Sequence, residues 1–271
     1  MPTNDSNQKY QIEAALKDFG DQPLDDAAIA LFEVLGYTSK KRLTLSPNTR
    51  EQFLATFAQG KTLNDKLALS DDWKSIDFLF QLTDNEIRKA DNQLLLFERK
   101  GEYNGAAIES YLFFALELKG DHYTRTDLAG ITRELNKLFA MPALVLFKHG
   151  NTITLGVINR RLHKREKSRD VLEKITLIKD IQFSHPHRAH IEILFDLSLG
   201  ALYEKHEFAN FVQLHAAWQK TLDIQALNKR FFIEVRNWFY WARLHASFPG
   251  GAKKDSDGRD SEALIRLLTR V

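Results

Sequence analysis

The sequence has no cysteine among its 271 residues, and its apolar runs are short. The missing thiols exclude disulfide frameworks, cysteine nucleophiles and thiolate metal sites. They also fit the reducing cytoplasm, which is the location that we expect for this protein. The apolar runs are bounded by charge, as in Tyr111 to Leu118, and the residues after Met1 form no apolar signal core. We therefore expect a soluble, untargeted protein with no membrane partner.

A strong charge of one sign is also missing, because 38 Lys and Arg residues face 36 Asp and Glu residues, which leaves a formal net charge of +2. Such a balance does not identify a partner. The chain is 44% apolar and long enough for one large domain or two small ones, so we expect a folded core. No internal repeat or low-complexity tract is present.

Helix and strand signals divide the chain into three regions. Residues 1–70 carry helical periodicity that ends at Gly36 and at Gly60, and they predict an N-terminal helical cap. Residues 71–195 carry the strand signals and predict an α/β (α+β) domain, with a mixed β-sheet flanked by helices. Residues 196–271 show helical stripes alone and predict an all-helical connector.

Within the middle region, compact apolar runs predict strands at 76–82, 94–97, 111–118, 143–147 and 152–158. Thr124 and Asp127 have the spacing of a capping box, and apolar residues follow at steps of three and four. We therefore predict an amphipathic helix over 125–139. Asp170 and Glu173 repeat this spacing and predict a further helix.

A hairpin is predicted between the second and third strands. Asn104-Gly105 lies between apolar runs, and this dipeptide is a strong hairpin signal because both residues tolerate positive φ. We therefore expect residues 92–103 to pair antiparallel with residues 106–119.

Two carboxylates and one ammonium come together in this predicted hairpin. Glu117 and Lys119 are two residues apart at the end of a strand, so their side chains share a face. The hairpin register places Asn92 opposite Glu117 and Asp91 beside it. Such a group can hold a divalent cation and a water, which makes Asp91 and Glu117 candidate metal ligands.

An Asp on one strand, Glu-x-Lys on the next, and then a helix and a strand form an arrangement that resembles the PD-(D/E)XK nuclease fold over about residues 70 to 150. The resemblance implies that Asp91 and Glu117 bind Mg²⁺. It also implies that Lys119 orients or activates the attacking water during hydrolysis of a DNA phosphodiester, as in a type II restriction endonuclease. Ala90 stands where the family has Pro. The alternative is a structural ion pair with Asp91 in a turn.

A basic segment follows the predicted strand at 152–158. It contains six cations and one acid in ten residues, and the cations are Arg160, Arg161, Lys164, Arg165, Lys167 and Arg169. These side chains are candidate contacts to the phosphates of double-stranded DNA, because each bound cation releases counterions. The alternative is a solvated loop.

Two further clusters predict structure rather than chemistry. The histidines at 185, 187 and 190 match no metal spacing and predict a turn before a helix from Ile191. The aromatic residues between 231 and 241 predict a core or a domain interface rather than a base-stacking platform.

Longer strings, among them Tyr111 to Leu118, Met141 to Phe147, Val171 to Asp180 and Ser261 to Arg270, resemble the N-terminal region of large bacterial restriction-modification DNA methyltransferases. This resemblance implies a nuclease-like domain, a helical connector, and a C-terminal methyltransferase domain that uses S-adenosylmethionine beyond this fragment. The present residues show no glycine-rich cofactor loop and no Asn-Pro-Pro-Tyr motif, so we predict no methyl transfer from them. A catalytically inactive DNA-positioning or regulatory domain is one alternative. An interaction module without a nucleic-acid role is another.

Overall fold

The computed structural model describes residues 4–83, 86–87, 110–139, 141–162, 170–222, 224–248 and 253–269. For residues 159–162, 170–174 and 224–231 this description covers the backbone only. The chain forms two compact units, Met1–Gln219 and Lys220–Val271. The division into three regions at residues 70 and 195 stays a prediction.

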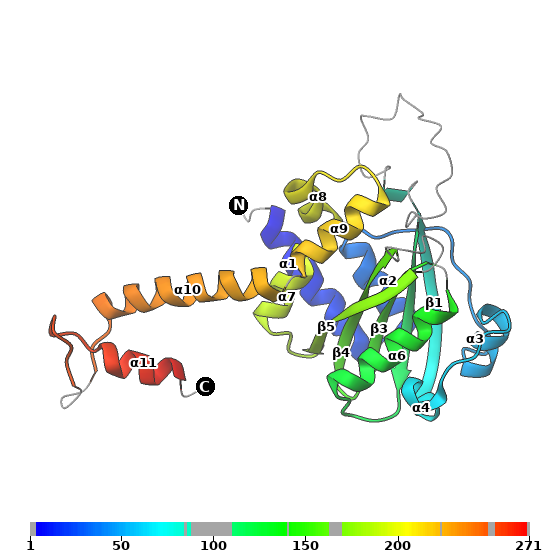
Figure 1. Cartoon of the computed structure of the whole chain (residues 1–271), viewed down its shortest axis with the longest axis horizontal. Helices are drawn as coiled ribbons and strands as arrows, with labels where there is room; N and C mark the ends of the chain where they lie inside the picture. Colours follow the sequence, from blue (N-terminus) through cyan, green and yellow to red (C-terminus); the bar gives the residue numbers. More distant parts are fainter. Residues whose placement is uncertain are drawn as a thin grey trace. The chain divides into compact units, whose positions relative to one another are not determined.

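A mixed sheet forms the centre of the Met1–Gln219 unit (Figure 1). Its described strands are β1 (Trp73–Thr83), β2 (Ser110–Leu118), β3 (Ala143–His149), β4 (Thr152–Leu162) and β5 (Asp170–Gln182), and they lie side by side in this order. The β2–β3 pair is parallel, and the other three pairs are antiparallel. Helices flank this sheet, so the predicted fold class is confirmed.

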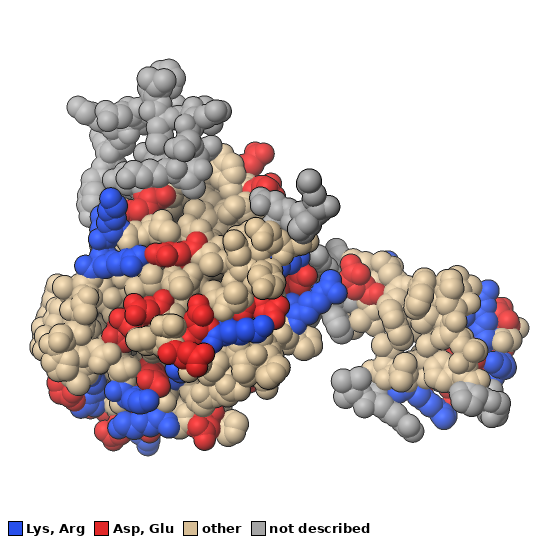
Figure 2. Space-filling view, turned by 180° about the vertical axis from the view of Figure 1, so that it is seen from behind, with Lys and Arg blue, Asp and Glu red and all other residues tan. Residues whose placement is uncertain are grey.

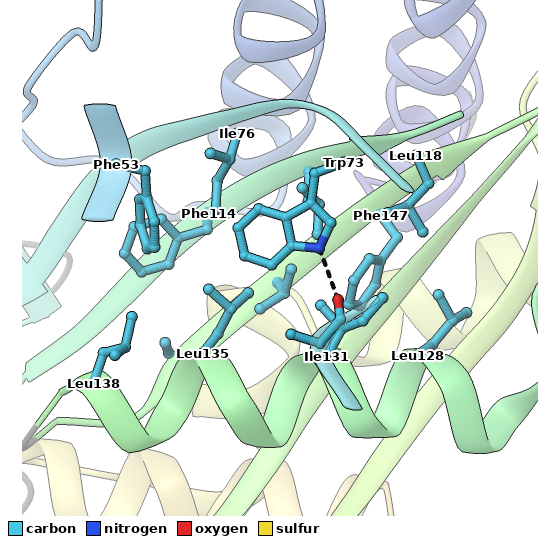
Figure 3. Close-up of a cluster of buried hydrophobic side chains, with 14 of the residues drawn as sticks. Phe53, Trp73, Ile76, Phe114, Leu118, Leu128, Ile131, Leu135, Leu138 and Phe147 are labelled. Carbon is cyan, nitrogen blue, oxygen red and sulfur yellow. Dashed lines mark hydrogen bonds between the residues drawn. The ribbon is translucent and has the colours of Figure 1, made fainter. Parts of the chain in front are cut away.

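The parallel β2–β3 pair depends on the helix that connects its two strands. Helix α6 (Arg125–Leu138) begins at Thr124, where the predicted capping box is formed with Asp127. Its apolar stripe of Leu128, Ile131 and Leu135 is fully buried against the sheet (Figure 3). The crossover helix therefore packs along the strands that it joins.

Two short helices complete the core on the α6 face, α3 (Arg50–Phe57) and α4 (Asp65–Ala68). Phe53 of α3 packs edge-to-face on Phe114 of β2, with ring centroids 5.6 Å apart. The indole Nε1 of Trp73 donates a hydrogen bond of 2.8 Å to the carbonyl oxygen of Ala68 (Figure 3). This bond satisfies a polar group that would otherwise be buried without a partner.

Other helices cover the opposite face of the sheet. Those described are α1 (Asn4–Lys17), α2 (Leu24–Val34), α7 (Arg188–Asp196), α8 (Leu199–His206) and α9 (Phe211–Thr221). Phe32 of α2 packs edge-to-face on Phe80 and Phe113 of the sheet. The hydroxyl of Tyr37 accepts a hydrogen bond from Trp218 and donates one to the carbonyl oxygen of Leu197. Burial raises the pKa of the Tyr37 hydroxyl well above its ordinary value.

The outer edge of β1 is covered by an irregular segment. The amide of Gln81 donates to the carbonyl of Lys41, and the amide of Ile76 donates to the carbonyl of Asn48. These bonds use part of an edge that would otherwise be open to pairing with another chain. They also hold the Asn48 side chain beside β1.

The helix predicted from Asp170 is wrong, because this segment is strand β5. The reason is that Ile175 and Leu177 alternate onto the core cluster while the backbone pairs with β4 along its length. Tertiary pairing outweighs a local capping pattern here. The predicted strand 94–97 lies outside the described residues.

The Lys220–Val271 unit consists of two described helices, α10 (Ile224–His245) and α11 (Ser261–Thr269). Arg243 of α10 forms an ion pair of 2.8 Å with Asp255 in the connection between them. Hydrogen bonds from the Ser261 hydroxyl, a backbone amide and the Arg243 guanidinium hold the pKa of Asp255 well below its ordinary value.

Three of the described aromatic side chains of α10 are exposed. Phe232, Tyr240 and Trp241 are 68%, 56% and 57% exposed. For these three residues the predicted core role is wrong, and their role in a domain interface stays a prediction. No helix in the described part of the chain is long and apolar enough to cross a membrane.

Candidate metal site on the sheet

Glu117 is placed by the register of the three adjoining strands. It lies opposite Ser75 of β1 on one side and beside Lys148 of β3 on the other. Asn92, which was expected opposite Glu117, lies outside the described residues, and among the described residues β1 and β3 border this part of β2. Asp91 itself lies outside the described residues.

A β-bulge brings a lysine to Glu117. Trp73 pairs with Leu118 and Ser75 pairs with Glu117, so Lys74 is an extra residue on β1. Such an insertion changes the direction of a side chain relative to a regular strand. The Nζ of Lys74 lies 2.9 Å from Oε1 of Glu117.

Lys119, the predicted water-positioning residue, has another partner. Its Nζ donates a hydrogen bond of 2.7 Å to the carbonyl oxygen of Asp71, and its amide donates to the carbonyl of Asp72. The structure thus brings Lys74 into an ion pair with Glu117 and fixes the Lys119 ammonium to the segment that precedes β1.

A second carboxylate near Glu117 was missed in the sequence. Asp77 lies on β1 opposite Ala115, so it shares the sheet face of Glu117 two residues further along β2. Diagonal neighbours of this kind are about 7–8 Å apart between their Cα atoms. Asp77 could have been found from Ile76-Asp77-Phe78, which places an acid inside an otherwise apolar strand.

The surroundings of Asp77 disfavour its charged form. The side chain is only 8% exposed, and its Oδ1 accepts a hydrogen bond of 2.9 Å from Asn48. Burial raises the pKa of Asp77, and the negative charges of Asp25 and Glu117 raise it further, whereas the Asn48 bond lowers it. Asp77 and Glu117 are therefore close enough to interact electrostatically.

The predicted DNA-contacting segment is described only at its start. Arg160 and Arg161 belong to β4, where their backbones pair with Leu172 and Val171 of β5. The other predicted contacts, Lys164, Arg165, Lys167 and Arg169, lie outside the described residues. Figure 2 shows acidic side chains interleaved with basic ones on the visible face, so the described residues of this face form no uninterrupted basic area.

The chemistry of the Asp77–Glu117 pair fits Mg²⁺. This ion prefers oxygen ligands and is commonly bound by one or two carboxylates, with waters and substrate phosphates completing its shell. Burial is the main cause that raises the pKa of Asp77, and the negative charges of Asp25 and Glu117 add to it, so a bound cation would relieve this repulsion. Among the residues that the structure describes, no group of three or more His, Cys, Asp or Glu side chains could hold a metal ion. Asp77 and Glu117 would thus be two candidate ligands, with waters and substrate completing the shell.

Comparison with known proteins identifies no relative of this chain. No family model, no curated protein and no solved structure matches this chain.

Proposed function

We propose that the Met1–Gln219 unit is a nuclease-like, DNA-contacting region of a restriction-modification enzyme, in which Asp77 and Glu117 hold Mg²⁺ for phosphodiester hydrolysis. One observation carries this proposal. Asp77 lies on β1, Glu117 follows on the adjacent β2, and α6 and then β3 come next along the chain. This is the arrangement on which the resemblance to PD-(D/E)XK nucleases rests, with Asp77 in the role predicted for Asp91.

The roles of the residues follow from their chemistry. A bound Mg²⁺ would neutralise charge on the scissile phosphate and make its bound water more acidic. Asp77, held by Asn48, and Glu117 are the groups that would bind the ion. Lys119 keeps its proposed role of orienting the attacking water, for which its ammonium must leave the carbonyl of Asp71.

The proposal includes partners and a location. Double-stranded DNA is the proposed substrate, with its phosphates on the basic segment 160–169. A methyltransferase domain that uses S-adenosylmethionine is the proposed neighbour, and the exposed aromatic face of α10 is its proposed contact surface. We place the protein in the cytoplasm because it contains no cysteine.

Cleavage of plasmid DNA tests the site directly. We expect Mg²⁺-dependent cleavage by the wild type and a loss of about 100-fold or more in Asp77→Asn and in Glu117→Gln. Asp65→Asn is the matched control, because Asp65 is an exposed carboxylate on α4 and should retain full activity. An active Asp77→Asn variant together with an inactive Asp91→Asn variant would instead support Asp91 as the partner of Glu117 in binding the metal.

A DNA-positioning domain without hydrolysis is the second candidate. The ion pair between Lys74 and Glu117 favours it, because a carboxylate that is already neutralised has less need of a metal. This candidate predicts DNA binding that falls steeply with added salt, without cleavage at any Mg²⁺ concentration. No DNA binding even at low salt would instead indicate an interaction module.

A further inference from the structure

We propose that Lys74 is a built-in competitor for the metal ion at Glu117, so that its ammonium must leave the carboxylate before a divalent cation binds there. This inference rests on the proposed function, because it concerns the same carboxylate pair. It assigns to Lys74 the control of how much free metal the site requires.

The backbone supplies the first argument. In a regular strand, Lys74 would point to the face opposite Ser75, away from Glu117. The bulge between Trp73 and Ser75 removes this alternation and lets Lys74 reach the carboxylate at 2.9 Å. Bulges are common beside active sites, where they redirect a side chain, and the bulge at Lys74 has this effect.

The other lysines near Glu117 supply the second argument, because they have different partners. Lys148 is the sheet neighbour of Glu117, but its Nζ lies over the ring of Phe183, 5.8 Å from the centroid. The Nζ of Lys119 donates to the carbonyl of Asp71. Of these three described lysines, Lys74 is the one whose ammonium forms an ion pair with the Glu117 carboxylate.

Exposure makes the exchange possible. The Lys74 side chain is 60% exposed, whereas that of Glu117 is 22% exposed. The ammonium can therefore move into solvent at little cost while the carboxylate stays in place. A divalent cation and an ammonium repel each other, so binding of one at Glu117 disfavours the other.

Mn²⁺ binding to the full chain, followed by electron paramagnetic resonance of the free ion at low ionic strength, tests this competition. Lys74→Met should bind Mn²⁺ about 5- to 10-fold more tightly than the wild type, and Lys74→Arg should bind like the wild type. Lys148→Met is the matched control, because it removes the same charge beside Glu117 without breaking the ion pair. It should change the affinity less than about 2-fold. Glu117→Gln should abolish binding.

The outcomes separate this inference from the proposed function. Wild-type affinity in Lys74→Met, with binding lost in Glu117→Gln, would overturn the competition and leave the metal site in place. Equal tightening in Lys74→Met and Lys148→Met would also overturn it, since a general charge effect would explain both. If neither the wild type nor Lys74→Met bound Mn²⁺, the metal site and the competition would fall together.

Discussion

Replacing Asp77 by Asn should make the protein more stable at neutral pH in the absence of divalent cations. The charged side chain is buried near other carboxylates, whereas a neutral amide of the same shape keeps an oxygen that accepts the bond from Asn48. Two like charges separated by about the 7–8 Å of diagonal Cα atoms repel by about 2 kcal/mol at an effective dielectric constant of about 20, and the Lys74 ammonium at Glu117 offsets part of this. Screening at about 0.15 M salt reduces this to about 1 kcal/mol, which is the gain that we expect for Asp77→Asn.

The gain should depend on pH with a defined sign. The pKa of Asp77 is raised in the folded state, so between its ordinary and its raised value the folded state binds more protons than the unfolded state. The free energy of unfolding contributed by Asp77 therefore falls as pH rises through this window. Above the window the penalty is complete, and below the ordinary pKa it is absent. The advantage of Asp77→Asn should thus be larger at neutral pH and vanish in acid.

Urea unfolding with chelator present, followed by tryptophan fluorescence between pH 4 and pH 8, measures this difference. Asp65→Asn is the control, because Asp65 is exposed and should change stability by less than about 0.5 kcal/mol at every pH. A variant that was less stable than the wild type at pH 7 would refute the electrostatic account of Asp77. A gain that did not change with pH would refute it as well.

Two further predictions concern the support of the β2–α6–β3 crossover. The buried side chain of Asn136 hydrogen-bonds both the amide and the carbonyl of Ala143, the first residue of β3. Asn136→Ala should therefore lower the free energy of unfolding in urea by about 2–4 kcal/mol. The control Arg133→Ala, on the exposed side of α6, should lower it by less than about 0.5 kcal/mol. Gly130→Ala would place Cβ 2.8 Å from the carbonyl oxygen of Leu67, and should destabilise by about 1–3 kcal/mol. Gly200→Ala meets no atom within 4 Å, and should stabilise by about 0.5 kcal/mol. Equal effects of the two glycine substitutions would contradict the close approach of α4 to α6.

Local signals predicted the elements that local interactions determine. The capping box and the apolar spacing of three and four residues predicted the bounds of α6 almost to the residue. Both signals depend on residues that are close together in the sequence. The strands β3 and β4 followed from compact apolar runs. The signal at Asp170 failed because pairing with β4, which is a tertiary interaction, determines that segment.

The candidate site was half predictable for the same reason. Glu117 was proposed as a ligand from a strand-end Glu-x-Lys, which is a local pattern. Its partner depends on which strand lies beside β2, and the Asn-Gly signal favoured a neighbour in sequence. The structure places β1 there and brings Asp77 beside Glu117, although 39 residues separate them in the sequence. A local sequence pattern does not report a contact over such a separation.

The most direct test of the account is a calorimetric titration of Mg²⁺ into the wild type, Asp77→Asn and Glu117→Gln. We predict one ion per wild-type chain and at least about a 10-fold loss of affinity in each variant, because both carboxylates bind the same ion. Unchanged Mg²⁺ binding in Asp77→Asn would contradict the claim that Asp77 and Glu117 form one site.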